Sequence, residues 1–332
     1  MKKYIAKRLL LMIPTFFGIT LITYGMVRLA PGDYTQLKAG MEALKQGSLS
    51  QEIIDQERAL YGLDRPIIVG YAQWLWKFVK LDFGNSRKDG RPVLSRIGEA
   101  LHVTITLSVI TIIVIYIISV PLGIFSAVRK DSLFDRGSGL VLFILYSLPS
   151  FWVALLLLTY LAGGEYLDLF PLGGISSDWA GEAGFFARAA DFAWHLVLPV
   201  ITLTYGSFAF LSRYTRANML EVINQQYITT ARAKGLSEMR VVFVHALRNS
   251  LVPLVTLMAS LLPGLIGGSV IVESIFSLPG IGRLGFEAIL SRDIPVIMAI
   301  ASISALLTLI GILLSDVLYA VVDPIIRLEG KA

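Results

Sequence analysis

The sequence predicts an all-α integral membrane protein with six transmembrane helices. Of its 332 residues, 55% are hydrophobic and 16% are charged, and the mean hydropathy is +0.70. A soluble domain cannot bury so large an apolar fraction. A helix needs about 20 apolar residues to cross the hydrocarbon core of a bilayer. Six uncharged runs have this length and lack the alternation of an outer-membrane β-barrel: Leu9–Val27, Val103–Val128, Gly137–Gly164, Phe192–Ser212, Leu251–Val272 and Ile294–Ser315.

Basic residues at the termini and in the short loops orient these runs. They precede the first run, separate the second from the third and the fourth from the fifth, and end the chain: Lys2, Lys3, Lys7, Arg8, Arg129, Lys130, Arg136, Arg213, Arg216, Arg232, Lys234, Arg240, Arg248, Arg327 and Lys331. Short loops rich in Lys and Arg stay in the cytoplasm, so both termini are predicted to be cytoplasmic. The first run is interpreted as a retained helix, because cleavage after Ala30 would place Arg28 at the −3 position.

The runs divide the chain into three parts. We expect the cytoplasmic N-terminus and first helix in residues 1–30, an external insert in 31–99 and a core in 100–332. Within the core, helices are expected at about 100–128, 137–163, 193–212, 251–272 and 295–318, with a cytoplasmic region at 213–250, an external loop at 273–295 and a cytoplasmic tail.

The external insert is predicted to be a small helical segment. Ser48–Leu60 and Pro66–Phe78 suit short helices, and Pro92–Ala100 is expected to lie along the membrane interface before the second span. Trp74 and Trp76 suit interfacial anchoring, and docking of a partner is the alternative.

The region Tyr227–Pro253 has the pattern of a helix, a glycine stop and a second helix. Gly235 suits the left-handed position that ends a helix, and Ser237 suits the N-cap of the next, with Glu238 in its first turn. Leu236 and Val241 occupy the positions of a hydrophobic staple.

The second of these helices is predicted to be amphipathic. Met239, Val242, Phe243 and Ala246 would form a mostly apolar face close to the membrane surface. Such a face suits either lipid headgroups or a protein partner, and the residues alone leave both possibilities open.

At these residues the chain resembles the transmembrane subunits of binding-protein-dependent ABC importers. That family's cytoplasmic signature is Glu-Ala-Ala-x3-Gly-x9-Ile-x-Leu-Pro, and here Thr229-Thr230-Ala231, Gly235 and His245–Arg248 keep its spacing. The Glu, the Ile and the final Pro are replaced, so Thr229 cannot make the charged contacts of the family's Glu.

Further motifs are similar to the oligopeptide, dipeptide and nickel subclass, in particular to its subunit with a large external insert after the first helix. They span the chain: Leu29–Asp33, Tyr61–Pro66, Asp82–Ser86, Ser147–Phe151, Thr230–Leu236, His245–Asn249, Gly267–Phe276, Leu278–Gly282, Arg292–Pro295 and Asp323-Pro324.

The resemblance implies the type I ABC importer permease fold and a set of partners. A second, non-identical permease subunit would complete the pathway in a bacterial or archaeal cytoplasmic membrane. Two cytoplasmic ATPase subunits would bind ATP and Mg, and an external solute-binding protein would deliver cargo. Peptides are the expected cargo, with nickel chelates, opines or oligosaccharides as alternatives.

A short coupling helix that docks on one ATPase is also implied by the resemblance. The chain has no Gly-x4-Gly-Lys-Ser/Thr phosphate loop, so ATP-driven work requires a partner and the chain itself is expected to be non-catalytic, without a bound cofactor. The predicted coupling residues are Thr230, Ala231, Arg232, Ala233, Lys234, Gly235, Leu236, Ser237, Glu238, Met239, Arg240, Val242, Phe243 and His245.

Helix-breaking residues in the fifth run suggest a pathway-lining helix that bends, although tight helix packing would also use them. The candidate pathway or gate residues are Pro263, Gly264, Gly267, Gly268, Glu273, Pro279 and Gly280. Glu273 could pair with Arg283 or Arg292, and a structural ion pair is favoured over contact with cargo.

Other classes of membrane protein fit less well. Secondary transporters place ionisable residues inside the membrane, and the six runs contain no Asp, Glu, Lys or Arg. An intramembrane protease would need a Ser/His pair within the membrane if it is rhomboid-like, or a His-Glu-x-x-His motif if it is metal-dependent, and the sequence indicates neither. The three histidines, His102, His195 and His245, lie at different segment ends, so no metal site is expected. A passive channel would leave the ordered segment Tyr227–Pro253 without a role. The net charge of +5 is modest and gives no reason to expect a nucleic-acid partner.

Overall fold

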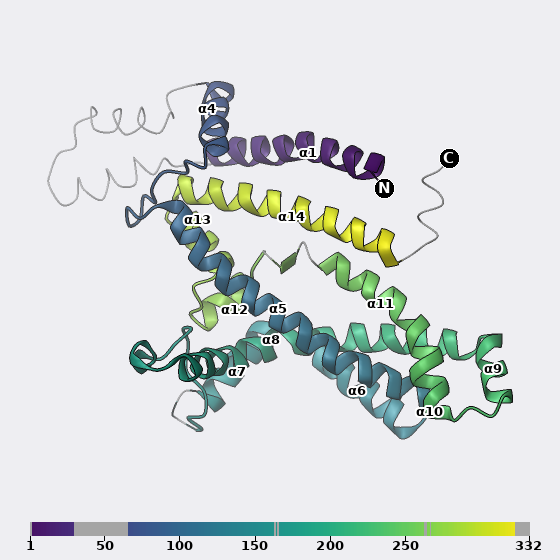
Figure 1. The fold of residues 1–332 in the computed structure, drawn as a ribbon. Coiled ribbons are helices and arrows are strands. Elements are labelled where there is room, and N and C mark those ends of the chain that lie inside the picture. The colour runs from purple at the N-terminus through teal and green to yellow at the C-terminus, as the bar shows by residue number, and fades with distance from the viewer. Residues whose placement is uncertain are drawn as a thin grey trace, which may run out of the picture. The chain divides into compact units, whose positions relative to one another are not determined.

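The computed structural model describes residues 2–29, 66–162, 164, 166–261, 264–265 and 267–322. These residues form helices joined by turns, with an isolated bridge between Asn85 and Pro92, so the predicted all-α class is confirmed (Figure 1). They divide into two compact units. One comprises His102–Arg283 and the chain from Ile310 onwards, and the other comprises Lys2–Leu101 and Leu284–Leu309.

The described helices have the following bounds: α1 Lys2–Leu29, α4 Ile67–Val79, α5 Val93–Val128, α6 Leu133–Ser147, α7 Ser150–Leu161, the 3₁₀-helix η1 Asp178–Glu182, α8 Phe185–Ile223, α9 Gln226–Ala233, α10 Glu238–Arg240, the π-helix η2 Val241–Ala246, α11 Leu247–Leu261, α12 Val270–Ile275, α13 Ile281–Leu290 and α14 Ile294–Val322.

Four of these helices are long and apolar enough to cross a membrane, namely α1, α5, α8 and α14. They contain the first, second, fourth and sixth predicted runs. Helix α5 begins at Val93 and continues without interruption to Val128. Nearly all of the segment Pro92–Ala100 is the start of this same helix, and its position along the membrane interface stays a prediction.

The third predicted run is two helices rather than one. Helices α6 and α7 meet at an angle of 94°. Pro149 cannot donate a helical hydrogen bond, and it disfavours helical geometry at the residue before it. Leu148 accordingly has extended angles, φ −83° and ψ 130°. Counting this pair as one crossing gives five candidate spans.

The fifth predicted run is also discontinuous. Helix α11 ends at Leu261, and α12 begins at Val270 after a segment in which Gly268 has φ +63°. The 15 residues of α11 reach about 22 Å at 1.5 Å per residue, less than the hydrocarbon core of about 30 Å. A continuous helix over Leu251–Val272 is therefore wrong, and the count of six spans stays a prediction.

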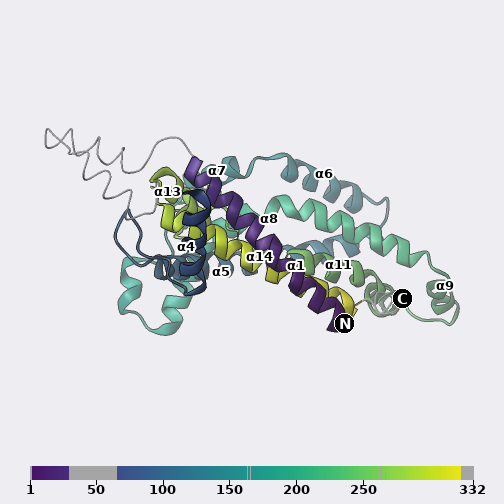
Figure 2. The same ribbon diagram turned by 90° about the horizontal axis from the view of Figure 1, so that it is seen from above.

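The unit that contains α5 to α12 has its apolar core between α5, α7, α8 and α12. Buried side chains of this core include Leu107, Leu196 and Phe276. Helices α6 and α8 pack side by side (Figures 1 and 2). Gly123 lets α5 approach α8 closely, because a side chain there would overlap the carbonyl oxygen of Ser212.

In the other unit, aromatic rings join α4 to α1. The Tyr71 ring stacks on Trp74 at 5.8 Å between centroids and meets Tyr24 edge-on at 5.7 Å. The Tyr71 hydroxyl also lies 2.9 Å from Thr20 Oγ1. The predicted helix Pro66–Phe78 is confirmed as α4, whereas the predicted helix Ser48–Leu60 lies outside the described residues.

Candidate functional site

The predicted helix, glycine stop and second helix are present between α8 and α11. Helix α9 ends at Ala233, and Gly235 follows with φ +76°, a left-handed angle that favours glycine. Ser237 takes the extended N-cap conformation before Glu238, although its hydroxyl makes no capping bond to the first turn. The Arg232 guanidinium bonds to Glu238 at 2.6 Å and thereby joins the two helices.

The inner side of this segment packs on a core built from α5 and α8. Ile228, Ala231, Val241, Val242 and Ala246 are buried with three residues of those helices, Ile124, Ala127 and Met219. Leu236 packs against the same cluster. The region is therefore a folded element fixed to two long helices.

The outer side exposes large apolar groups. Met239 is 70% exposed, Val244 54% and Phe243 41%. We call the outer residues of this segment, Tyr227, Arg232, Lys234, Ser237, Glu238, Met239, Arg240, Phe243 and Val244, the coupling surface; all are exposed.

The predicted single apolar face is wrong in detail. Met239 and Phe243 point outward, whereas Val242 and Ala246 are buried together with Val241. The reason is that residues 241–246 form a π-helix, which has more residues per turn than an α-helix. Val241 and Ala246, five residues apart, therefore lie on the same inner side.

The charges of the coupling surface are partly neutralised within the chain. Arg232 and Glu238 form an exposed ion pair at 2.6 Å, and exposed pairs of this kind contribute little to stability. Lys234 and Arg240 are exposed beside the apolar side chains. The surface thus combines apolar contact area with basic groups.

Several candidate gate residues meet around one buried carboxylate. The Glu273 side chain is fully buried and accepts hydrogen bonds from Thr104 Oγ1 at 3.1 Å, the Ser269 backbone N–H at 3.3 Å and the Arg283 backbone N–H at 2.8 Å. Gly268 and Gly280 leave the space that this carboxylate fills, because a Cβ at either position would overlap it.

This arrangement gives Glu273 a structural role in holding the turn that contains Pro279 and Gly280. Gly264 and Gly267 lie in the break between α11 and α12, and Pro263 is outside the described residues. Thr104, whose hydroxyl also accepts from the Ile281 N–H at 2.8 Å, was missed by the sequence analysis because nothing near it in sequence indicates this contact.

A second buried carboxylate was also missed. Asp135 accepts two hydrogen bonds from Arg216, at 2.8 and 2.6 Å, and one from Arg213 at 3.3 Å. The sequence analysis used the two arginines only to orient the chain. Ser132 is the N-cap of α6, and its hydroxyl accepts a hydrogen bond from the backbone N–H of Asp135. A serine followed three residues later by an acidic residue was the signal in the sequence for a helix start here.

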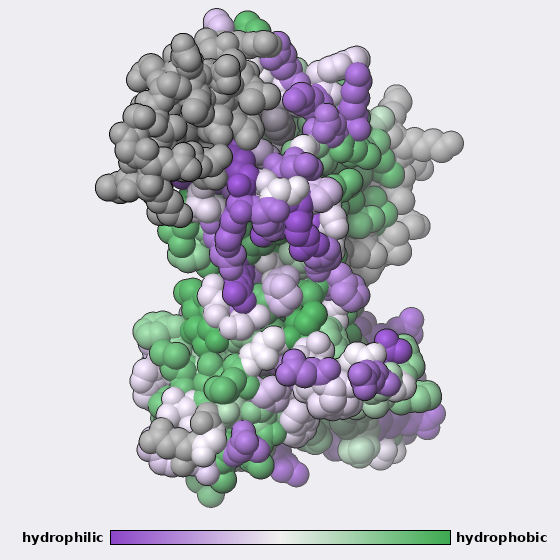
Figure 3. Space-filling view, turned by 90° about the vertical axis from the view of Figure 1, so that its left-hand side faces the viewer, coloured by the Kyte–Doolittle hydropathy of each residue, from purple (hydrophilic) through white to green (hydrophobic). Residues whose placement is uncertain are grey.

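A third buried carboxylate, Asp293, holds the loop between α4 and α5 against the start of α14. It accepts from Ser86 Oγ at 2.5 Å and from the Arg87 backbone N–H at 3.0 Å, and Lys88 pairs with Glu287 at 2.9 Å. Hydrophilic residues gather on the face that contains this loop (Figure 3). The motifs Asp82–Ser86 and Arg292–Pro295 are therefore parts of one contact.

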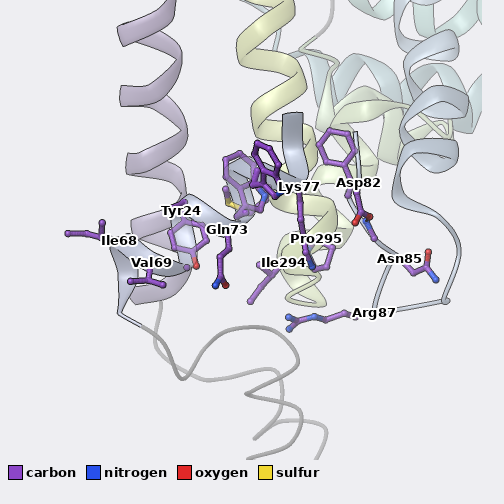
Figure 4. A pocket seen from close by; sticks show the side chains of 17 residues that line it. Tyr24, Ile68, Val69, Gln73, Lys77, Asp82, Asn85, Arg87, Ile294 and Pro295 are labelled. Carbon is purple, nitrogen blue, oxygen red and sulfur yellow. The ribbon is translucent and has the colours of Figure 1, made fainter. Parts of the chain in front are cut away.

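The same unit contains a cavity of about 880 Å³. It is lined by the end of α1, by α4, by the loop 82–87 and by the start of α14, and its polar side chains include Gln73, Lys77, Asp82 and Arg87 (Figure 4). Both Trp74 and Trp76 line it, and Lys80 lies 4.7 Å above the Trp76 ring. None of the predicted site residues lines this cavity.

Comparison with known proteins agrees with this architecture. Residues 119–328 match the family of inner membrane components of binding-protein-dependent transport systems. The chain belongs to this family. As a binding-protein-dependent permease of the type I fold, it is a membrane-embedded component of an ABC transporter.

Three relatives are similar to the permease over its full length. The oligopeptide transport system permease protein AppB of Bacillus subtilis is 42% identical over 98% of this chain and 99% of its own. The dipeptide transport system permease protein DppB of Escherichia coli K12 is 36% identical, with the same coverage. The peptidoglycan transport system permease protein YejB of Agrobacterium fabrum is 33% identical over all of both chains.

Proposed function

We propose that this chain is one permease subunit of a peptide importer and that its coupling surface binds a cytoplasmic ATPase subunit. ATP and Mg would be bound by two such subunits, and a second permease subunit would complete the pathway. An external solute-binding protein would deliver the cargo. The family membership supports this set of partners, and the basic residues that flank the helices support cytoplasmic termini in a bacterial or archaeal inner membrane.

The observation that carries this proposal is the two-sided packing of residues 226–246. Val241, Val242 and Ala246 fix the segment to α5 and α8, while Met239, Phe243 and Val244 remain exposed. An apolar group exposed on a well-packed element, with basic groups around it, is typical of a protein-binding surface. The alternative is that these side chains rest on lipid headgroups.

The test is substitution of the exposed apolar groups in the complete transporter. We expect Met239→Glu and Phe243→Glu to reduce co-purification of the ATPase subunit and cargo uptake at least tenfold, because each places a charge in an apolar contact. Leu133→Glu is the matched control, since Leu133 is a 91% exposed apolar residue on the same predicted side of the membrane.

Direct contact is tested by cross-linking. The chain contains no cysteine, so a single Ser237→Cys variant carries one reactive thiol. We expect it to form an adduct with the ATPase subunit through a short bifunctional reagent, whereas Leu133→Cys does not. If the Ser237 variant is modified only by lipid-linked reagents, the surface lies on the bilayer and the docking proposal is wrong.

Peptides are proposed as cargo because two of the three relatives carry oligopeptide or dipeptide transport in their names. The transporter, reconstituted with its receptor, is expected to take up labelled di- to pentapeptides in an ATP-dependent manner. Uptake of a peptidoglycan fragment, a nickel chelate or an oligosaccharide in place of these peptides would reassign the cargo within the same transporter class.

A further inference from the structure

The buried Asp135 joins two helices at the cytoplasmic end predicted for them. Its side chain is 5% exposed, and Arg216 of α8 binds both of its carboxylate oxygens. The Asp131 backbone N–H donates to the same group at 3.1 Å. The Arg213 guanidinium lies across Gly139 of α6, where any side chain would overlap it. The contact between α6 and α8 thus includes a charge pair whose carboxylate is buried and whose Arg216 side chain is 21% exposed.

Helix α8 also holds the other end of α6. The Tyr205 hydroxyl donates to the Leu148 carbonyl oxygen at 2.7 Å, at the bend between α6 and α7. That carbonyl is free to accept because Leu148 is extended, and the N–H groups of Trp152 and Val153 in α7 bond to the Pro149 carbonyl instead. Helix α6 is therefore joined to α8 at its first turn and at Leu148, the residue that follows its last turn.

Helix α5 is attached to the same assembly. Its Gly123 contacts the backbone of α8 at Ser212, and the hydroxyls of Ser126 in α5 and Ser138 in α6 lie 3.2 Å apart. These contacts surround the turn of α8 that carries Arg213 and Arg216. Helices α5, α6 and α8 are thus in contact with one another close to Arg213 and Arg216.

One turn further along, α8 packs against the buried side chains of the segment that carries the coupling surface. Met219 is fully buried among Ile228, Val241 and Ala246, and the Ser250 hydroxyl lies 2.8 Å from its sulfur. Ile124 and Ala127 of α5 belong to this same core. A displacement of η2 consequently acts directly on α8 and α5.

We propose that Asp135 is a positioning residue for energy coupling: by pairing with Arg216 it makes α6 move with α5, α8 and the coupling surface as one body. The inference rests on the proposed function, since it assumes that an ATPase moves this surface. Without the Asp135 carboxylate, α8 would still be displaced but would no longer carry α6 with it. Coupling between distant sites can be carried by packed side chains, ion pairs and rigid helices, and the Asp135–Arg216 pair joins elements of this kind.

The first test uses Asp135→Asn in the complete transporter reconstituted with its receptor, with trialanine as the probe. Asparagine keeps the shape but removes the charge that Arg216 faces. We expect the complex to assemble and hydrolyse ATP at a rate within threefold of wild type, while the ratio of uptake to ATP hydrolysis falls at least tenfold. An unchanged ratio would overturn the proposal, because a purely structural role lowers both activities together.

Two further variants separate loss of the pair from loss of a particular side chain. Arg216→Lys keeps the charge but cannot bind both oxygens at once, so an intermediate fall in the ratio is expected. Ser147→Ala removes an exposed hydroxyl of α6 that bonds to the Phe143 carbonyl of the same helix, and it serves as the control, with a ratio within twofold of wild type. Equal effects of all three variants would contradict a role specific to the charge pair.

A cross-link tests the same idea while the Asp135–Arg216 pair stays in place, and it is decisive if the Asp135 variant does not assemble. In the chain without native cysteines, Ser126→Cys with Ser138→Cys places two thiols between α5 and α6. Oxidation to a disulfide should leave uptake within twofold of the reduced form if the helices move as one body. Loss of uptake that is restored by reduction would show that they move separately.

The two proposals fail in different ways. If Met239→Glu and Phe243→Glu leave ATPase binding intact, the proposed function is wrong. If those variants release the ATPase while Asp135→Asn keeps a normal ratio of uptake to hydrolysis, or the disulfide stops uptake, then only the role of Asp135 is wrong.

Discussion

Individual carboxylates fix the turns of this permease. Asp135, Glu273 and Asp293 are all nearly fully buried, and each accepts hydrogen bonds from backbone N–H groups. Hydrogen bonds to a charged group are about twice as strong as neutral ones. Each carboxylate joins segments that are far apart in the sequence or in different helices.

The hydrogen bonds of the Glu273 carboxylate are expected to stabilise the folded protein. One of its oxygens faces Thr104 and Ser269 and the other faces Arg283, so Glu273→Gln must direct an amide nitrogen at a donor. We expect a loss of about 1.5–3 kcal/mol in the free energy of unfolding, measured as a lower Tm of the purified protein. Glu182→Gln at an exposed position is the control, and equal Tm values for the two variants would contradict the bonding described here.

At the scale of whole elements, two apolar runs do not form single helices. The bend between α6 and α7 follows from Pro149, and the break between α11 and α12 contains Gly264, Gly267 and Gly268. In both places the freed backbone groups have partners elsewhere: Tyr205 bonds to the Leu148 carbonyl, and the Ser269 N–H bonds to Glu273. The breaks are therefore stabilised parts of the architecture.

Tyr205→Phe tests the first break. Removing the hydroxyl leaves the Leu148 carbonyl without this donor, and we expect the free energy of unfolding to fall by about 0.5–1.5 kcal/mol. Thermal unfolding in detergent measures the change, with Tyr160→Phe at a half-exposed position as the control. If Tyr205→Phe has the same Tm as the control, the bend does not depend on this hydrogen bond.

At the scale of the whole molecule, the basic residues of the short loops and the coupling surface are predicted to lie on the cytoplasmic side of the membrane. The charged residues of the loop between α7 and α8 are acidic, and this loop is predicted to lie on the other side of the membrane. The absence of native cysteine makes this topology directly measurable.

Two single-cysteine variants place thiols on the two predicted sides. In right-side-out vesicles, a membrane-impermeant maleimide is expected to label Glu182→Cys but to label Lys234→Cys only after the vesicles are opened. Both positions are exposed, so accessibility within the fold does not confound the result. Labelling of Lys234→Cys in intact vesicles would reverse the orientation and remove the coupling surface from the cytoplasm.

Local sequence chemistry predicted several elements correctly. The glycine stop at Gly235, the helix start after Ser237 and the helix α4 were all confirmed, because the backbone conformation at these positions depends on neighbouring residues. The orientation of Val242 and Ala246 was predicted incorrectly, because the change to π-helical winding depends on how the segment packs against Met219 and its neighbours.

The sequence by itself determined the all-α class, the membrane environment and the family, because composition, apolar run length and motif spacing are properties of the chain alone. Only the tertiary structure decided which runs are broken and which carboxylates join them. Asp135 and Arg216 are separated by 81 positions, and a contact over that distance exists only once α6 and α8 have packed together. The same folding buries Val241, Val242 and Ala246 and leaves the residues of the coupling surface exposed.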